Sequence, residues 1–177
     1  MPQLDFPGAN PQGVELAQRL FVIHDQMRRD MDEFRRLVTA VVDGIGGDAA
    51  ARGRLQGAMD AFRQRDWQRI LPRYCAQFCS FVHGHHTVED ASMFPVLQKR
   101  NPDLAPRIKQ LVEEHGRLVE HLDQLQQMIR LLPGDPSLGP KMLAKVGEVA
   151  ELLSAHLEYE ETHLTPTLVR LTYADIA

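Results

Sequence analysis

Residues 85–97, HHTVEDASMFPVL, decide the fold of this chain together with a later stretch, residues 156–168, HLEYEETHLTPTL. The two stretches lie 71 residues apart and share a His, a Glu four residues later, a Pro six residues after that and a Leu two further on. A spacing of four places two side chains on one face of a helix, one turn apart. The sequence therefore presents an imidazole and a carboxylate side by side on each of two helices.

An imidazole and a carboxylate on one helix face can hold a metal ion between them. A single His-x-x-x-Glu is more often an exposed pair on a helix surface, but a repeat that also keeps its Pro and Leu is harder to explain in that way. Two such helices that face each other could hold two ions, with each carboxylate bridging them. The first candidate ligands are His85, Glu89, His156 and Glu160.

The composition is that of an ordinary globular domain, with 177 residues, 44% hydrophobic and 25% charged. A net charge of −4 offers no basic surplus for a nucleic acid. No apolar run has the length of a membrane span, and the first residues lack the features of a secretory signal. Cys75 and Cys79 lie one helical turn apart, a poor geometry for a disulfide, and are expected to be reduced and buried. We therefore expect a cytoplasmic protein without a nucleic-acid or membrane partner.

Helical periodicity covers most of the chain. Residues 1–11 carry three prolines and a glycine and predict an extended N-terminal arm, followed by a single domain over residues 12–177. Four long amphipathic helices are expected at about residues 12–43, from about 66–71 to a break or kink at Pro95, 103–132 and 141–172, with a short extra helix at 48–66. The short connections between the later helices favour antiparallel neighbours. The predicted fold is all-α, an up-down-up-down antiparallel four-helix bundle.

Two more histidines interrupt the apolar stripes of the first and third long helices. His24 lies among Leu20, Met27 and Met31, and His115 is the one polar residue in a stripe of aliphatic side chains. At a rise of about 1.5 Å per residue, both histidines fall in the same layer of the bundle as the repeated motifs. A polar side chain in an apolar core is costly without a partner.

Six inward polar residues thus gather in one layer: His24, His85, Glu89, His115, His156 and Glu160. A pair of metal ions would satisfy them, and mixed imidazole and carboxylate ligands suit iron, with manganese or zinc less favoured. A network of hydrogen bonds without a metal is the alternative.

This pattern, with a lone His and then His-x-x-x-Glu repeated once over four helices, resembles the haemerythrin-like (HHE cation-binding) family. The resemblance covers about residues 12–172 and is carried by the motifs HHTVEDASMFP and HLEYEETHLTP. It implies a non-haem diiron centre in a four-helix bundle. By the same resemblance, the four histidines would be terminal ligands, and Glu89 and Glu160 would bridge two iron ions that share an oxo or hydroxo group.

The sequence departs from the oxygen-carrying members at the third helix. Carriers place a second histidine four residues after the ligand there, where this chain has Val119. Counting twelve positions on two octahedral irons then leaves two open, which favours turnover of peroxide or oxygen over reversible carriage. The expected function is a catalase-like or peroxidase-like reaction of a diiron centre. The alternative is non-enzymatic binding of oxygen, nitric oxide or iron, as a carrier, store or sensor. The partners would be O2, H2O2 or NO, and the chain would be a monomer or weak homodimer; the sequence identifies no catalytic residue.

The other histidines have less specific positions. His83 and His86 flank a motif histidine and are expected on the helix surface, as is His121. His163 follows Glu160 by three residues on the same stripe, so it could assist or join the ligand set or simply pack in the core. The resulting Glu-x-x-His is also found in ferritin-like diiron proteins, but that class needs the motif twice, and Ser92 stands at the equivalent place in the first copy.

Overall fold

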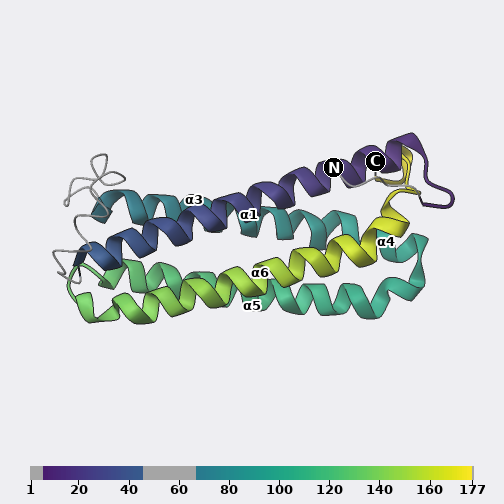
Figure 1. Cartoon of the computed structure of the whole chain (residues 1–177). Helices are drawn as coiled ribbons and strands as arrows, with labels where there is room; N and C mark the ends of the chain where they lie inside the picture. The colour runs from purple at the N-terminus through teal and green to yellow at the C-terminus, as the bar shows by residue number, and fades with distance from the viewer. Residues whose placement is uncertain (1–5, 46–66, 177) are drawn as a thin grey trace. The chain divides into compact units, whose positions relative to one another are not determined.

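The computed structural model describes residues 6–45 and 67–176, and this part of the chain is helical without a strand. The long helices are α1 (Pro11–Ile45), α3 (Trp67–Val88), α5 (Ala105–Leu131) and α6 (Gly139–Leu168) (Figure 1). Shorter elements are a π-helix (Glu89–Met93), α4 (Phe94–Arg100), two 3-10 turns (Pro102–Leu104 and Pro136–Leu138) and α7 (Tyr173–Ile176). The prediction of an all-α fold is confirmed. Within the described ranges, no helix has the length and hydropathy needed to cross a membrane.

The helix boundaries follow local chemistry. Asn10 directly precedes α1, where its side-chain oxygen accepts a hydrogen bond from the backbone N–H of Gly13, 3.0 Å away, and so caps the helix. Asn101 and Asp135 do the same for the 3-10 turns that precede α5 and α6, each accepting from the N–H two residues later. A proline follows each of these two caps, at a position where its missing N–H costs nothing.

Most predicted helix bounds lie within two residues of the observed ones. The last helix is the exception, because α6 ends at Leu168 and not near Thr172, and a turn and the short α7 follow. The extra helix expected at residues 48–66 and the first residues of the predicted arm lie outside the described residues.

The predicted break at Pro95 takes another form. The helix continues through the motif as a π-helix at Glu89–Met93, and Pro95 lies in the first turn of α4. Proline cannot donate the usual bond to the carbonyl four residues earlier. One wider turn, in which the N–H of Phe94 donates to the carbonyl of Glu89, absorbs this defect. Phe94 and Leu97 are then buried in the core.

The chain forms two compact units. Unit 1 consists of the described residues within Met1–Arg28, Val82–Arg117 and Leu153–Ala177, and unit 2 of those within Arg29–Phe81 and Leu118–Leu152. The apolar core of unit 1 is built by residues from α1, α4, α5 and α6, among them Ala17, Leu20, Phe94, Leu97, Leu111, Leu164 and Leu168. The start of α1 is held to the end of α6, because Asn10 donates from its backbone to the carbonyl of Val169 and from its side chain to that of Leu171.

Unit 2 has a core of its own, in which the ring of Phe34 stacks on Tyr74 and Phe78 with centroids 5.9 and 6.0 Å apart. Cys75 and Cys79 are buried and free, as expected, with their sulfur atoms 3.6 Å apart. Helical spacing predicts an inward stripe on α3 of Leu71, Tyr74, Phe78, Phe81 and His85, and the observed stripe differs from it. Tyr74 is only half-buried and Phe81 is exposed, whereas their neighbours Cys75 and Val82 are buried. The buried face of α3 is therefore shifted by one residue, toward the C-terminus, from the face that the aromatic side chains predict.

Candidate metal centre

All six predicted ligands lie in unit 1, and the fold brings them together. His24 comes from α1, His85 from α3, Glu89 from the π-helix, His115 from α5, and His156 and Glu160 from α6. His85 retains slight exposure, with 7% of its side chain accessible, and the other five are buried. Ligand atoms of His24, His85, Glu89 and Glu160 all lie within 4.8 Å of one another, a spacing that could hold an ion.

The four histidines form two pairs that meet through their Nε2 atoms. The Nε2 atoms of His24 and His85 are 3.2 Å apart, and those of His115 and His156 are 3.1 Å apart. Each pair joins a lone histidine to a motif histidine. The structure thus presents two imidazole pairs, each able to offer two nitrogen ligands to one ion.

The two glutamates lie between the pairs. One oxygen of Glu89 is 2.8 Å from Nε2 of His85, and the other is 3.6 Å from Nε2 of His115. Glu160 approaches both pairs through one oxygen, 3.4 Å from Nε2 of His24 and 3.9 Å from Nε2 of His156. Each carboxylate therefore reaches a histidine of both pairs, the placement that a bridging ligand requires.

Three further carboxylates orient the histidines from outside. Nδ1 of His115 donates to Asp90, 2.9 Å away, and Nδ1 of His156 donates to Glu114 at the same distance. Nδ1 of His24 likewise lies 2.9 Å from Glu161. A carboxylate only accepts hydrogen bonds, so these Nδ1 atoms carry the proton, and a neutral ring then has a lone pair on Nε2. Such carboxylate–histidine contacts are typical of metal sites, where they fix the tautomer and the ring orientation.

The facing imidazole nitrogens and the buried carboxylates would both be stabilised by a cation between them. The Nε2 lone pairs of His115 and His156 face each other at 3.1 Å, and they repel unless a positive charge lies between them. None of the four carboxylate oxygens of Glu89 and Glu160 makes a hydrogen bond, although all four are buried. Buried carboxylates without partners are strongly unfavourable. The residues present therefore fit a pair of metal ions.

The burial and close spacing of these groups also shift the pKa values of Glu160, Glu89 and His156. Burial, and then the negative charge of Glu89, raise the pKa of Glu160 well above its ordinary value. Burial would raise the pKa of Glu89, but the neighbouring imidazoles of His24 and His85 outweigh it and lower the pKa of that carboxyl. Burial lowers the pKa of His156 to about 4, so this ring is neutral at pH 7. In the metal-free protein Glu160 therefore gives up its proton less readily than an ordinary glutamate, and a bound cation would favour its ionised form.

His86 was expected on the helix surface, and this expectation is wrong. Its side chain is buried in unit 1, and neither ring nitrogen makes a hydrogen bond. The cause is the rotated inward stripe of α3, which turns both His85 and His86 toward the interior. His83, in contrast, is exposed as expected.

The orienting carboxylates Asp90 and Glu114 were not foreseen. The repeat does indicate two of the orienting carboxylates, Asp90 and Glu161. In both copies an acidic residue directly follows the proposed bridging glutamate. These equivalent residues orient equivalent histidines, His115 and His24. Glu114 has no such counterpart, since Ile23 precedes the histidine of α1.

His163 lies outside both groups of ligand atoms. It is half-buried, and its ring packs edge-on against Tyr159 with centroids 4.2 Å apart. Ser92, the residue at the equivalent place in the first copy, is exposed.

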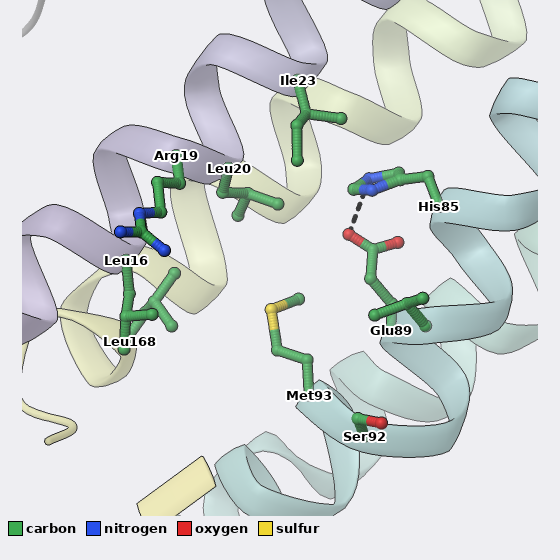
Figure 2. A pocket seen from close by; sticks show the side chains of 10 residues that line it. Leu16, Arg19, Leu20, Ile23, His85, Glu89, Ser92, Met93 and Leu168 are labelled. Atoms are coloured by element: carbon green, nitrogen blue, oxygen red, sulfur yellow. Dashed lines mark ion pairs between the residues drawn. The ribbon is translucent and has the colours of Figure 1, made fainter. Parts of the chain in front are cut away.

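One pocket in unit 1 reaches the candidate centre, as Figure 2 shows. It has a volume of about 320 Å³ and is bordered by His85 and Glu89. Its remaining wall is mainly apolar, with Leu16, Leu20 and Ile23 from α1 and Met93 from the π-helix. The pocket offers a small, weakly polar molecule a way to the least buried histidine of the set.

Comparison with known proteins agrees with this geometry. Residues 54–168 match the model of the hemerythrin HHE cation binding domain. The chain belongs to this family. The match includes five of the six predicted ligands, and His24 lies before it. No curated protein and no solved structure matches the chain. The family and the His/Glu cluster together indicate that the domain binds metal.

Proposed function

We propose that this protein is a non-haem diiron protein that reacts with hydrogen peroxide or oxygen, and that its helices form the antiparallel up-down-up-down bundle expected from the sequence. One observation carries the proposal: two imidazole pairs are spanned by two buried carboxylates whose oxygens have no hydrogen-bond partner. Under this proposal His24, His85, His115 and His156 are terminal ligands, and Glu89 and Glu160 are bridges.

Iron is the proposed metal because the donor set mixes imidazoles with carboxylates. Thiolate ligands would favour zinc or iron–sulfur clusters, and an all-oxygen set would favour magnesium or calcium. The two free cysteines lie in unit 2, whereas all candidate ligands lie in unit 1. Manganese and zinc remain the competing metals for such a site.

The iron pair would supply redox chemistry, and the chain's own residues would control access and geometry. Asp90, Glu114 and Glu161 hold the imidazoles in the tautomer that directs Nε2 inward. The apolar wall of the pocket favours entry of a small, weakly polar molecule next to His85. These features suit the disproportionation of two molecules of H2O2 into one of O2 and two of water.

The test is oxygen evolution. Each of the two proposed positions has two imidazoles and shares two carboxylates, so iron-loaded protein should carry about two irons per chain. This protein should release O2 from H2O2 in steady state, followed with an oxygen electrode. Glu160→Ala removes a bridge and should lose most of the iron and the activity together. Elemental analysis that finds one zinc and no iron after expression in iron-replete medium would contradict the proposal.

Non-enzymatic binding of oxygen, nitric oxide or iron is the second candidate. It is favoured by the burial of five of the six ligands, which protects a bound ion from bulk water. Addition of O2 or NO to the reduced protein, reversed by removal of the gas and without peroxide turnover, would favour a carrier, store or sensor.

Two further features belong to the proposal. The free, buried cysteines support a reducing compartment, the cytoplasm. The chain is proposed to act as a monomer or weak homodimer, which sedimentation of the metal-loaded protein would test.

A further inference from the structure

His86 is a buried imidazole that the six-ligand assignment leaves without a role. Only 2% of it is exposed, and neither Nδ1 nor Nε2 makes a hydrogen bond. A buried polar group without a partner costs on the order of 1–3 kcal/mol. A histidine kept at such a position therefore needs a partner that the protein atoms do not supply.

The surroundings of His86 are other imidazoles. Its ring stacks on His115 with centroids 4.0 Å apart and an angle of 7° between the planes, and it meets the ring of His156 edge-on at 5.1 Å. One ligand nitrogen from each of these three residues lies within 4.8 Å of the others. Imidazole nitrogens bind zinc-sized ions at about 2.1 Å, so two nitrogens on one ion are at most about 4.2 Å apart. Parallel rings direct their lone pairs side by side, so the His86 ring would turn out of its stack on His115 to share an ion with the other two nitrogens.

The helix register supports this placement. His86 precedes Glu89 by three residues, so both lie on one face of the same helix. Glu89 directs one of its oxygens toward His115, 3.6 Å from its Nε2. His86 and Glu89 thus approach the same histidine pair from α3 and from the π-helix that follows it.

The repeat shows that packing alone does not demand a histidine here. The equivalent residue in the second copy is Leu157, which is fully buried in the same unit. An aliphatic side chain therefore fills this position in one copy, and the first copy has an imidazole in its place.

We propose that His86 is a metal ligand, the third imidazole of the ion position formed by His115 and His156. This inference rests on the proposed two-metal function and makes its two positions unequal. One position has three imidazoles, and the other has two, His24 and His85; both share the carboxylates. The imidazole-rich position takes ions that favour nitrogen ligands, such as zinc or iron, more strongly than the other.

Zinc titration of the metal-free protein tests the assignment. Zn(II) serves as the probe, and competition with a chromophoric chelator measures both dissociation constants. Wild type should bind two ions with unequal affinity. His86→Leu, which copies the second repeat, should weaken the tighter step by at least about tenfold, the size of effect seen even for outer partners of metal ligands. The exposed His83, one turn earlier on α3, provides the control, because His83→Leu should leave both constants unchanged.

A second measurement uses wild-type protein alone and does not depend on the folding of a variant. The chain has eight histidines. With 15N-labelled histidine and two equivalents of Zn(II), imidazole NMR should show five metal-bound rings. Four metal-bound rings with two zinc ions, or unchanged constants in His86→Leu, would overturn the His86 assignment and leave the two-metal site standing. Wild type that binds fewer than two ions would overturn the two-metal function and the His86 assignment together.

Discussion

His115 and His156 each have one nitrogen bonded to a carboxylate and the other 3.1 Å from a neighbouring imidazole nitrogen. The carboxylate decides what the inward nitrogen can do, since a proton fixed on Nδ1 leaves a lone pair on Nε2. Asp90 and Glu114 therefore contribute to metal affinity through the histidines that they orient. Removing one frees the imidazole to change its tautomer and to turn.

Glu114 offers a direct test of this orienting role. Glu114→Ala removes the acceptor of His156 Nδ1, 2.9 Å away, and leaves all six proposed ligands in place. We expect metal affinity to fall about 10–100-fold, measured by chelator competition. The neighbouring Glu113 is exposed and pairs only loosely with Lys109, at 3.8 Å. Glu113→Ala is thus the matched control and should keep the wild-type affinity; equal losses in both variants would refute the orienting role.

The substitution Glu160→Gln should stabilise the metal-free protein but prevent binding of the metal pair. In the metal-free protein, burial and Glu89 raise the pKa of Glu160 well above 4.5, so its ionisation opposes folding at neutral pH. Glu160→Gln removes this charge and should stabilise the metal-free fold by about 1–2 kcal/mol, or about 2–8 °C in Tm. The same change removes a bridging oxygen and should abolish binding of the metal pair.

The pH dependence follows from the sign of that shift. A carboxyl whose pKa is raised by folding costs no stability below its unfolded value, where it is protonated in both states. The cost grows as pH rises above about 4.5, the ordinary value for Glu. The stabilisation by Glu160→Gln should therefore be largest at pH 7 and vanish near pH 4, in thermal unfolding of chelator-treated protein. A constant difference across this range would assign the effect to packing.

At the scale of the elements, the π-helix explains how one stretch can hold both Glu89 and a proline. The wider turn keeps Glu89 facing the histidine pairs and still buries Phe94 after it. The second copy reaches the same end differently, because Pro166 lies inside α6, which stops two residues later. Identical spacing in sequence thus gave two different local structures, and periodicity alone could not distinguish them.

The start of α1 and the end of α6 meet at a point without room for a side chain. A Cβ on Gly13 would lie 2.2 Å from the carbonyl oxygen of Val169, a backbone atom that cannot rotate away. Gly13→Ala should therefore destabilise the protein by about 1–3 kcal/mol. Gly116, on α5, has open space around its Cβ position. Gly116→Ala should instead stabilise by about 0.5–1 kcal/mol through helix propensity, and denaturant unfolding of both variants would show the opposite signs.

At the scale of the whole chain, the sequence predicted the helical class, most helix bounds and the residues that now lie together. The His-x-x-x-Glu repeat and the histidines inside aliphatic stripes carried that information, because polar residues in apolar stripes need partners. The orienting acids and His86 could not be found in this way. Asp90 and Glu114 look like ordinary surface acids in sequence, and the face on which His86 lies depends on a rotation of α3 by about one residue.

The ligands also come from segments far apart in the chain, which couples metal binding to folding. His24 and Glu160 lie at opposite ends of the sequence, yet His24 Nε2 is 3.4 Å from Glu160. An unfolded chain cannot present such a set, so the proposed ions would bind only the folded state and stabilise it. Each ion present at 100 times its dissociation constant adds about 2.7 kcal/mol.

Metal removal should therefore lower the Tm of this protein substantially. The two proposed ions would add about 5 kcal/mol at that excess, and each kcal/mol corresponds to about 2–4 °C for a chain of this size. Chelation should lower the Tm by on the order of 10–20 °C, measured by differential scanning calorimetry. His115→Ala removes a ligand, so its Tm should respond much less to the chelator. If wild type did not respond, the buried polar layer would be satisfied by its own hydrogen bonds, without metal. If His115→Ala responded as strongly as wild type, His115 would not be a ligand.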